Sequence, residues 1–154
     1  MDVLQAFFAR YQLPLEELVR VRKAKLMREW WNAFAAPHKQ PSQIWPAISK
    51  DSLWEVFSVG CAPSLEGAAA WEAFTQIEPC QFLVAPNSRC PLYRCDATGC
   101  GDFSGLIRDL ENLLETDGRK CLDTYVMDLG FNWTWVFTHE SGWGMGPYYA
   151  MGVS

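Results

Sequence analysis

The stretch that decides the fold is Cys121–Tyr149, C-L-D-T-Y-V-M-D-L-G-F-N-W-T-W-V-F-T-H-E-S-G-W-G-M-G-P-Y-Y. Its two apolar runs, residues 122–128 and 132–139, predict a pair of strands joined by a short turn. Because side chains alternate along a strand, the odd-numbered residues from Trp133 to His139 should share one face of the second strand. The stretch also holds three of the eight Trp and three of the five Tyr, so we expect any functional site here.

The preceding sequence predicts helices and further strands around this pair. Apolar residues at helical spacing predict helices over residues 2–11, 15–35, 65–76 and 103–115, and apolar runs bounded by turn residues predict strands over 51–59, 81–85 and 91–95. Asp102 is suited to cap the last helix and Gly118 to end it. The order predicts one α+β domain over 1–154, with a helical part at 1–50 and a sheet-containing body at 51–154. The sheet is expected to be antiparallel, with about five strands and with helices packed against it.

Length and composition favour a folded cytoplasmic protein. A chain of 154 residues with 49% hydrophobic content is long enough to bury the core of one domain. No apolar run approaches the ~20 residues that a membrane span requires. The first residues carry an acid where a secretory signal carries basic residues, and Gln5 and Arg10 interrupt their apolar run.

The formal net charge of −5 is unevenly distributed. Residues 1–50 carry eight basic and four acidic side chains, whereas residues 51–154 carry five basic and fourteen acidic ones. An acidic body disfavours nucleic acid, because nucleic-acid affinity rests on neutralising phosphates. It favours a basic protein partner, because complementary fields speed the encounter.

The predicted partner-binding residues combine acids with aromatic side chains. Trp and Tyr are frequent anchors of protein interfaces, and exposed carboxylates steer a basic partner toward them. The expected anchors are Trp143, Tyr148 and Tyr149, and we include His139 and Glu140 in the same surface. The acids expected to steer are Glu55, Glu72, Asp96, Asp102, Asp123 and Asp128.

The pair His139-Glu140 supports an alternative function, a small hydrolase-type enzyme. An imidazole with a carboxylate nearby can serve as a general base. However, neighbouring residues of a strand point to opposite faces, and no nucleophile motif accompanies the pair. The other interpretation is a structural histidine whose ring bonds to the backbone near the chain's tail.

The sequence predicts no metal or cofactor. The cysteines at 90, 95 and 100 are spaced C-x4-C-x4-C, without the C-x2-C pairs typical of structural zinc sites. In a reducing cytoplasm, Cys80 and Cys95 should be buried, reduced thiols within strands. The acids at 96, 102, 123 and 128 match no calcium loop, and Asp128 is better explained as a turn residue. The segment G-C-G-D-F-S-G at 99–105 lacks the lysine of a phosphate-binding loop.

The basic residues of the N-terminal part lie on the predicted helix 15–35. They are Arg20, Arg22, Lys23, Lys25 and Arg28. No aromatic residues alternate with these charges, so we interpret them as a solvated helix face, or as a face lying near the acidic body of the same chain. A regulator that uses this helix on nucleic acid is the weaker alternative.

Three segments carry a resemblance to a family. They are L-W-E-V-F-S at 53–58, L-E-G-A-A-A-W-E-A-F at 65–74, and the D-T-Y-V-M-D, W-T-W-V-F-T-H-E and G-P-Y motifs between 123 and 148. Together they resemble an uncharacterised bacterial domain-of-unknown-function family with L-W-x-x-F-S and W-T-x-V-x-T-H-E…G-P-Y motifs. The resemblance covers about the last two-thirds of the chain and implies a small cytoplasmic protein, without an activity. Small acidic α+β proteins are also similar to the immunity proteins that neutralise bacterial toxins, and this analogy implies a basic toxin domain as the partner.

Overall fold

The computed structural model describes residues 3–18, 21–50, 52–86, 91–116 and 123–153. Its helices are α1 (Val3–Arg10), α2 (Val21–Phe34), α3 (Glu55–Ser58), α4 (Ala68–Phe74) and α5 (Phe103–Thr116), with short 3-10 turns η1 (Ala36–His38) and η2 (Ser141–Trp143). Its strands are β1 (Leu15–Leu18), β2 (Leu65–Glu66), β3 (Gln81–Pro86), β4 (Leu92–Asp96), β5 (Thr124–Asp128), β6 (Trp133–Phe137) and β7 (Tyr148–Met151). None of these helices is long and apolar enough to cross a membrane.

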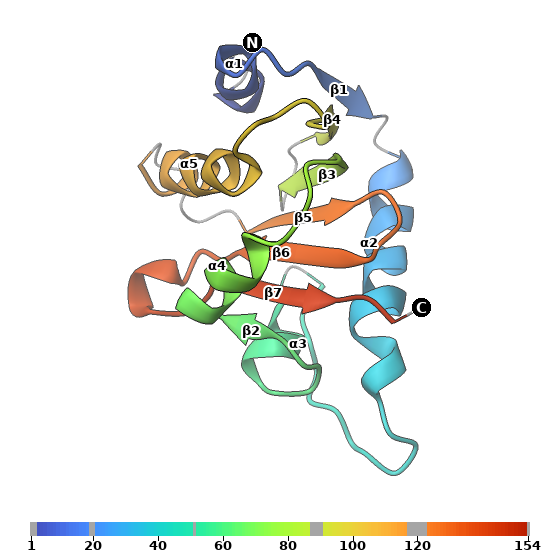
Figure 1. Cartoon of the computed structure of the whole chain (residues 1–154). Coiled ribbons are helices and arrows are strands. Elements are labelled where there is room, and N and C mark those ends of the chain that lie inside the picture. Colours follow the sequence, from blue (N-terminus) through green and yellow to red (C-terminus); the bar gives the residue numbers. More distant parts are fainter. Residues whose placement is uncertain (1–2, 19–20, 51, 87–90, 117–122, 154) are drawn as a thin grey trace.

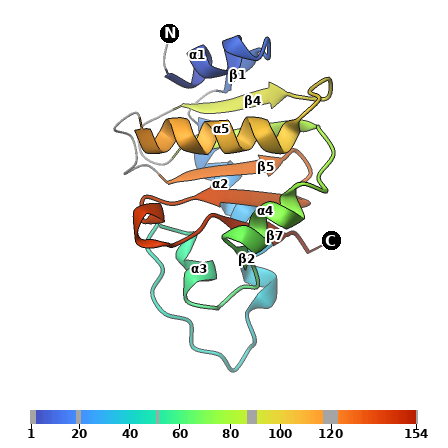
Figure 2. The same cartoon turned by 60° about the vertical axis from the view of Figure 1, so that its left-hand side comes forward.

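The strands form one antiparallel sheet in the order β1-β4-β3-β5-β6-β7-β2. Helices cover both of its faces, with α2 on one side and α1, α4 and α5 on the other (Figure 1, Figure 2). The predicted α+β class and the antiparallel sheet with helices packed against it are therefore confirmed, with seven strands instead of about five.

Each face of the sheet has its own hydrophobic core. On one face, Trp133, Trp135 and Phe137 pack with α1, α4 and α5, as the predicted alternation along β6 requires. On the other face, Val136 packs with α2 and α3. Burial on both faces explains why the central strands are almost continuously apolar in sequence.

The helix α5 begins where the sequence predicts. The Oδ1 atom of Asp102 accepts a hydrogen bond from the backbone N–H of Gly105 at 3.0 Å, which is the expected capping contact. The buried stripe of the helix includes Leu106, Ile107 and Leu110. Two predictions fall outside the described residues: the helix end at Gly118, and the segment between the predicted strands 81–85 and 91–95, with Cys90.

The prediction of one helix over 15–35 is wrong at its start. Leu15–Leu18 is strand β1, paired with β4, and the helix begins at Val21. The sequence L-E-E-L fits a strand equally well, with half-buried leucines and exposed acids in this structure. Glu16 lies opposite Arg94 in the register, and their side chains form an ion pair. A cross-strand partner distant in the sequence therefore decides the conformation.

The predicted strand over 51–59 is also wrong, because Glu55–Ser58 is the short helix α3. The predicted helix 65–76 begins later, at Ala68, because residues 65–66 form β2 on the edge of β7. Gly67 separates the two elements with a φ of 62°, a backbone conformation that favours glycine. Strand β7 itself was not predicted from the sequence.

The two edges of the sheet are short strands. β1 has four residues, of which Glu16 and Glu17 are exposed. β2 has two residues and lies at the opposite edge, beside β7. The long, apolar strands β3, β5 and β6 are therefore internal.

Candidate functional site

Three of the predicted acids lie at the ends of strands, and they are divided between opposite ends of the sheet. Asp96 and Asp128 end β4 and β5 and lie at the start of β3, where they pair in the register with Gln81 and Phe82. Asp123 lies at the other end, immediately before β5, with His139 and Glu140. The structure therefore does not bring Asp96 and Asp128 together with Asp123.

Asp96 and Asp128 stabilise turns. Asp96 Oδ1 accepts hydrogen bonds from Thr98 Oγ1 at 2.7 Å and Thr98 N at 3.0 Å, which hold the pKa of that carboxyl below its usual value. Asp128 accepts hydrogen bonds from the backbone N–H and the side-chain amide of Asn132, both at 2.7 Å. The predicted role of Asp128 as a turn residue agrees with these contacts. Glu72 is exposed on α4, and Glu55 is half-buried on α3.

The centre of the candidate site is the buried carboxylate of Asp123, which is 2% exposed. Its Oδ2 atom accepts a hydrogen bond from Trp54 Nε1 at 2.8 Å. Its Oδ1 atom lies 2.8 Å from both the backbone N and the ring Nδ1 of His139. These contacts satisfy the buried charge and join three distant segments of the chain.

The strand register places Asp123 beside His139. Thr124 of β5 pairs with Phe137 of β6, so the residue before β5 lies beside the residues that follow β6. The strand ends at Phe137, and the chain then turns, so the alternation of side chains does not extend to His139 and Glu140. Consequently His139 Nε2 and Glu140 Oε1 are 3.7 Å apart, although neighbouring residues of a strand would point apart.

The imidazole of His139 is held on one side and open on the other. Its Nδ1 atom is engaged by Asp123, and 37% of its side chain is exposed. With Nδ1–H donated to the carboxylate, the neutral ring carries its lone pair on Nε2, beside Glu140. The ring is therefore oriented by a buried acid and has one nitrogen available to a ligand or substrate.

Aromatic side chains pack around Trp54, which donates to Asp123. Trp54 stacks on Tyr148, with ring centroids 5.9 Å apart and an interplanar angle of 22°. The backbone N–H of Trp54 donates to the hydroxyl of Tyr125 at 3.1 Å. Burial, together with Glu66 and Glu140, raises the pKa of Tyr148 to about 12. Trp54, Tyr125 and Glu66 were not among the predicted site residues.

The connection between β6 and β7 presents Trp143 to solvent. This side chain is 80% exposed, at the end of η2. Gly144 follows it in the left-handed conformation with a φ of 79°, which glycine adopts without strain. The backbone of the same connection is fixed by Glu66, whose Oε1 atom accepts a hydrogen bond from Gly146 N at 2.9 Å.

The other two predicted anchors are not at the surface. Tyr148 and Tyr149 belong to β7 and are 1% and 6% exposed, with one ring in each core. Asp123 is likewise buried, so its side chain does not face solvent. Trp143 is the predicted anchor whose side chain is exposed.

The described cysteines are free thiols. Cys95 is buried in β4, and burial raises its pKa to about 12, while burial raises the pKa of Cys80 to about 11. A raised pKa disfavours the thiolate, which is the nucleophilic form of cysteine. The described residues contain no group of three or more side chains suited to hold a metal ion.

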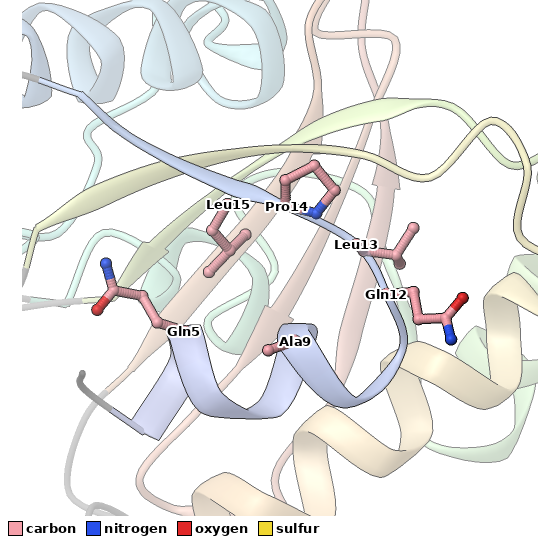
Figure 3. A pocket seen from close by; sticks show the side chains of 6 residues that line it. All are labelled: Gln5, Ala9, Gln12, Leu13, Pro14 and Leu15. Carbon is pink, nitrogen blue, oxygen red and sulfur yellow. The ribbon is translucent and has the colours of Figure 1, made fainter.

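A hollow of about 460 Å³ lies between α1 and the start of β1 (Figure 3). It is lined by Gln5 and Ala9 of the helix and by residues 12–15. Among the described residues that line it, the polar side chains are the amides of Gln5 and Gln12, and none is titratable. It offers no group for acid–base or nucleophilic chemistry.

We compared the chain with protein families, curated proteins and solved structures. Neither the curated proteins nor the solved structures gave a match. Residues 12–149 match the family described as Domain of unknown function (DUF4275). This match includes most residues of both cores and the contacts around Asp123, but not α1. The chain belongs to the DUF4275 family.

Proposed function

We propose that the protein is a binding module for a basic protein, and that it binds through the surface around Trp143. This Trp143 surface consists of Glu66, His139, Glu140 and Trp143. In its most specific form, the proposal is a cytoplasmic bacterial immunity protein that neutralises a basic toxin domain.

The exposure of Trp143 is the observation that carries this proposal. A tryptophan that is 80% exposed contributes little to the core, whereas tryptophan is enriched among the anchors of protein interfaces. Its backbone is held in place, because Trp143 N donates to the carbonyl of Glu140 at 2.9 Å. A positioned backbone lowers the entropy lost when the side chain enters a partner's pocket.

The charges around Trp143 favour a basic partner. Glu66 accepts a hydrogen bond from Gly146 N at 2.9 Å, and Glu140 accepts one through its carbonyl from Trp143 N, so both acids adjoin the connection that carries Trp143. The remaining exposed acids of the predicted set, Glu72, Asp96 and Asp102, lie outside this surface. In this proposal they add to the long-range field that steers a cationic protein.

The test begins with capture of partners on the immobilised protein from an extract of the source organism, followed by mass spectrometry and affinity measurement with the purified partner. We expect Trp143→Ala to weaken binding by about 2 kcal/mol, or roughly 30-fold, as expected for a central aromatic anchor. The double variant Glu66→Gln, Glu140→Gln should slow association severalfold at low salt.

Matched controls use residues outside the Trp143 surface. Ile44 is 96% exposed, so Ile44→Ala removes an exposed apolar side chain elsewhere. Glu17→Gln with Glu78→Gln removes two exposed charges outside the surface. The first control should bind as the unchanged protein does. The second should slow association less than the double variant Glu66→Gln, Glu140→Gln, because its two charges contribute to the long-range field alone. Binding that survives Trp143→Ala, and that added salt leaves unaffected, would contradict the proposal.

A second candidate function, a hydrolase, is favoured by the contact between Asp123 and His139. An imidazole oriented by a buried carboxylate, with its other nitrogen open, is suited to act as a general base. If the protein hydrolyses esters or amides in a substrate screen, His139→Asn should lower the rate by 10²–10⁴-fold, the usual contribution of such a base. Trp143→Ala should leave that rate unchanged, and a rate indifferent to His139→Asn would exclude this role.

A further inference from the structure

A groove runs between α2 and residues of the segment 39–50 together with Leu53, and it shares no residue with the Trp143 surface. It consists of two adjoining hollows of about 590 Å³ and 430 Å³, which share Trp31 and Leu53. The chain leaves α2, turns at the end of the molecule and returns to α3, so that α2 and the returning segment form its walls (Figure 1). We call this the Trp31 groove.

The walls of the Trp31 groove are largely apolar. The rings of Trp31 and Trp45 meet edge to face, with centroids 6.0 Å apart. Met27 and Leu53 extend the apolar lining within the larger hollow. The indole N–H of Trp45 is buried and has no hydrogen-bond acceptor in the described part of the chain. A buried donor without an acceptor costs free energy.

Three cations line the same groove. Arg28 and Lys50 belong to the larger hollow, and Lys39 belongs to the smaller one, where its Nζ atom lies 5.9 Å from the Trp45 ring centroid. Among the described residues, none of the three has a carboxylate within ion-pair distance. By contrast, Lys25, which lies on α2 with Arg28, forms an ion pair with Glu29 at 4.0 Å. The groove therefore combines aromatic walls with positive charges that have no carboxylate partner in the described part of the chain.

We propose that the Trp31 groove binds a small organic anion, namely a carboxylate or phosphate group attached to an aliphatic or aromatic body. The apolar body would lie against Trp31 and Trp45, and the anionic group would lie near Arg28, Lys39 and Lys50. The volume of the larger hollow is within the 300–1,000 Å³ range of small-molecule sites. This site uses the basic part of the chain, which the Trp143 surface leaves without a role.

The test measures binding of simple probes to the purified protein by titration calorimetry. Decanoate and decyl phosphate carry the two candidate anionic groups on one tail, and the tighter of the two identifies the preferred group. Decanol and decyltrimethylammonium keep the tail without the negative charge. We expect at least one of the two anions to bind, decanol to bind at least tenfold more weakly than that anion, and the ammonium compound not to bind.

The charge variants locate the site. Arg28→Gln, Lys39→Gln and Lys50→Gln together should weaken anion binding at least tenfold, because an exposed charge pair contributes up to about fivefold each. The matched control, Arg10→Gln, Lys25→Gln and Arg108→Gln, removes three cations outside the groove and should change binding less than twofold. The proposal is overturned if neither anion binds at millimolar concentration, if decanol binds as tightly, or if both triple variants behave alike.

Discussion

Replacing Asp123 with alanine is expected to lower the free energy of unfolding by about 3–5 kcal/mol. The substitution leaves the buried indole N–H of Trp54 and the backbone N–H of His139 without their acceptor. Each buried, unpaired donor costs about 1–3 kcal/mol, and the lost contacts were to a charged group. Urea or guanidinium unfolding, followed by tryptophan fluorescence, measures the change.

Two further variants test the origin of that loss. Asp123→Asn retains one carbonyl oxygen for His139 and should cost less than Asp123→Ala. Trp54→Phe removes the donor that Asp123 satisfies, so the pair Asp123→Ala, Trp54→Phe should be less destabilising than the sum of the single changes. Glu72→Ala, at an exposed position on α4, is the control and should stay within about 0.5 kcal/mol. Full additivity, or a cost of Asp123→Ala below that control limit, would show that these hydrogen bonds do not stabilise the fold.

Phe74→Ala is expected to destabilise the protein by about 3–5 kcal/mol, the usual cost of truncating a buried aromatic side chain. Phe74 is fully buried, with its ring centroid 4.8 Å from that of Trp135, 5.3 Å from that of Trp133 and 5.4 Å from that of Phe103. Its removal leaves a cavity between α4, α5 and the sheet, and it also loses the aromatic pair contacts. The loss should appear as a lower denaturant midpoint with an unchanged slope.

Two control variants test whether the cost of Phe74→Ala comes from the cavity. Phe74→Leu fills part of the space and should cost about 1–2 kcal/mol. Trp143→Ala deletes a larger aromatic side chain that is exposed, so it should alter stability by no more than about 0.5 kcal/mol. If Phe74→Ala costs no more than Phe74→Leu, α4 closes the cavity and the packing around Phe74 is adaptable.

The elements that could be predicted from the sequence are those whose own residues determine them. The helix α5 has an Asp102 cap and an apolar stripe, and β6 has a strict alternation of large apolar side chains. The conformations of β1 and β7 depend instead on distant partners, β4 for the first and β6 for the second. Four residues carry too short a pattern to distinguish a strand from a helical turn without that partner. The run Y-Y-A-M after Pro147 does match a short buried strand, and it is the signal that was available for β7.

The candidate site was predicted in part. His139 and Glu140 were named because a histidine beside an acid is visible in the sequence. The partner of His139, Asp123, is 16 residues away, and the contact follows only from the register of β5 on β6. Fixing the turn of that hairpin would have placed Asp123 beside residues 138–139. Trp54 reaches Asp123 from a segment 69 residues away in sequence, and no local pattern indicates such a contact.

The short, acidic strands at the two edges of the sheet have a consequence for crowded solutions. An uncovered edge offers unpaired backbone groups to any passing extended chain, and fibril growth starts from such edges. Here one edge carries the exposed carboxylates of Glu16 and Glu17, and the other is two residues long. A second molecule that approached the first edge with its own β1 would meet like charge at Glu17, since Glu16 is paired with Arg94. At the second edge it would find too little backbone to pair with. The two edges therefore disfavour strand pairing between molecules, and the aromatic strands in the middle of the sheet stay paired within one molecule.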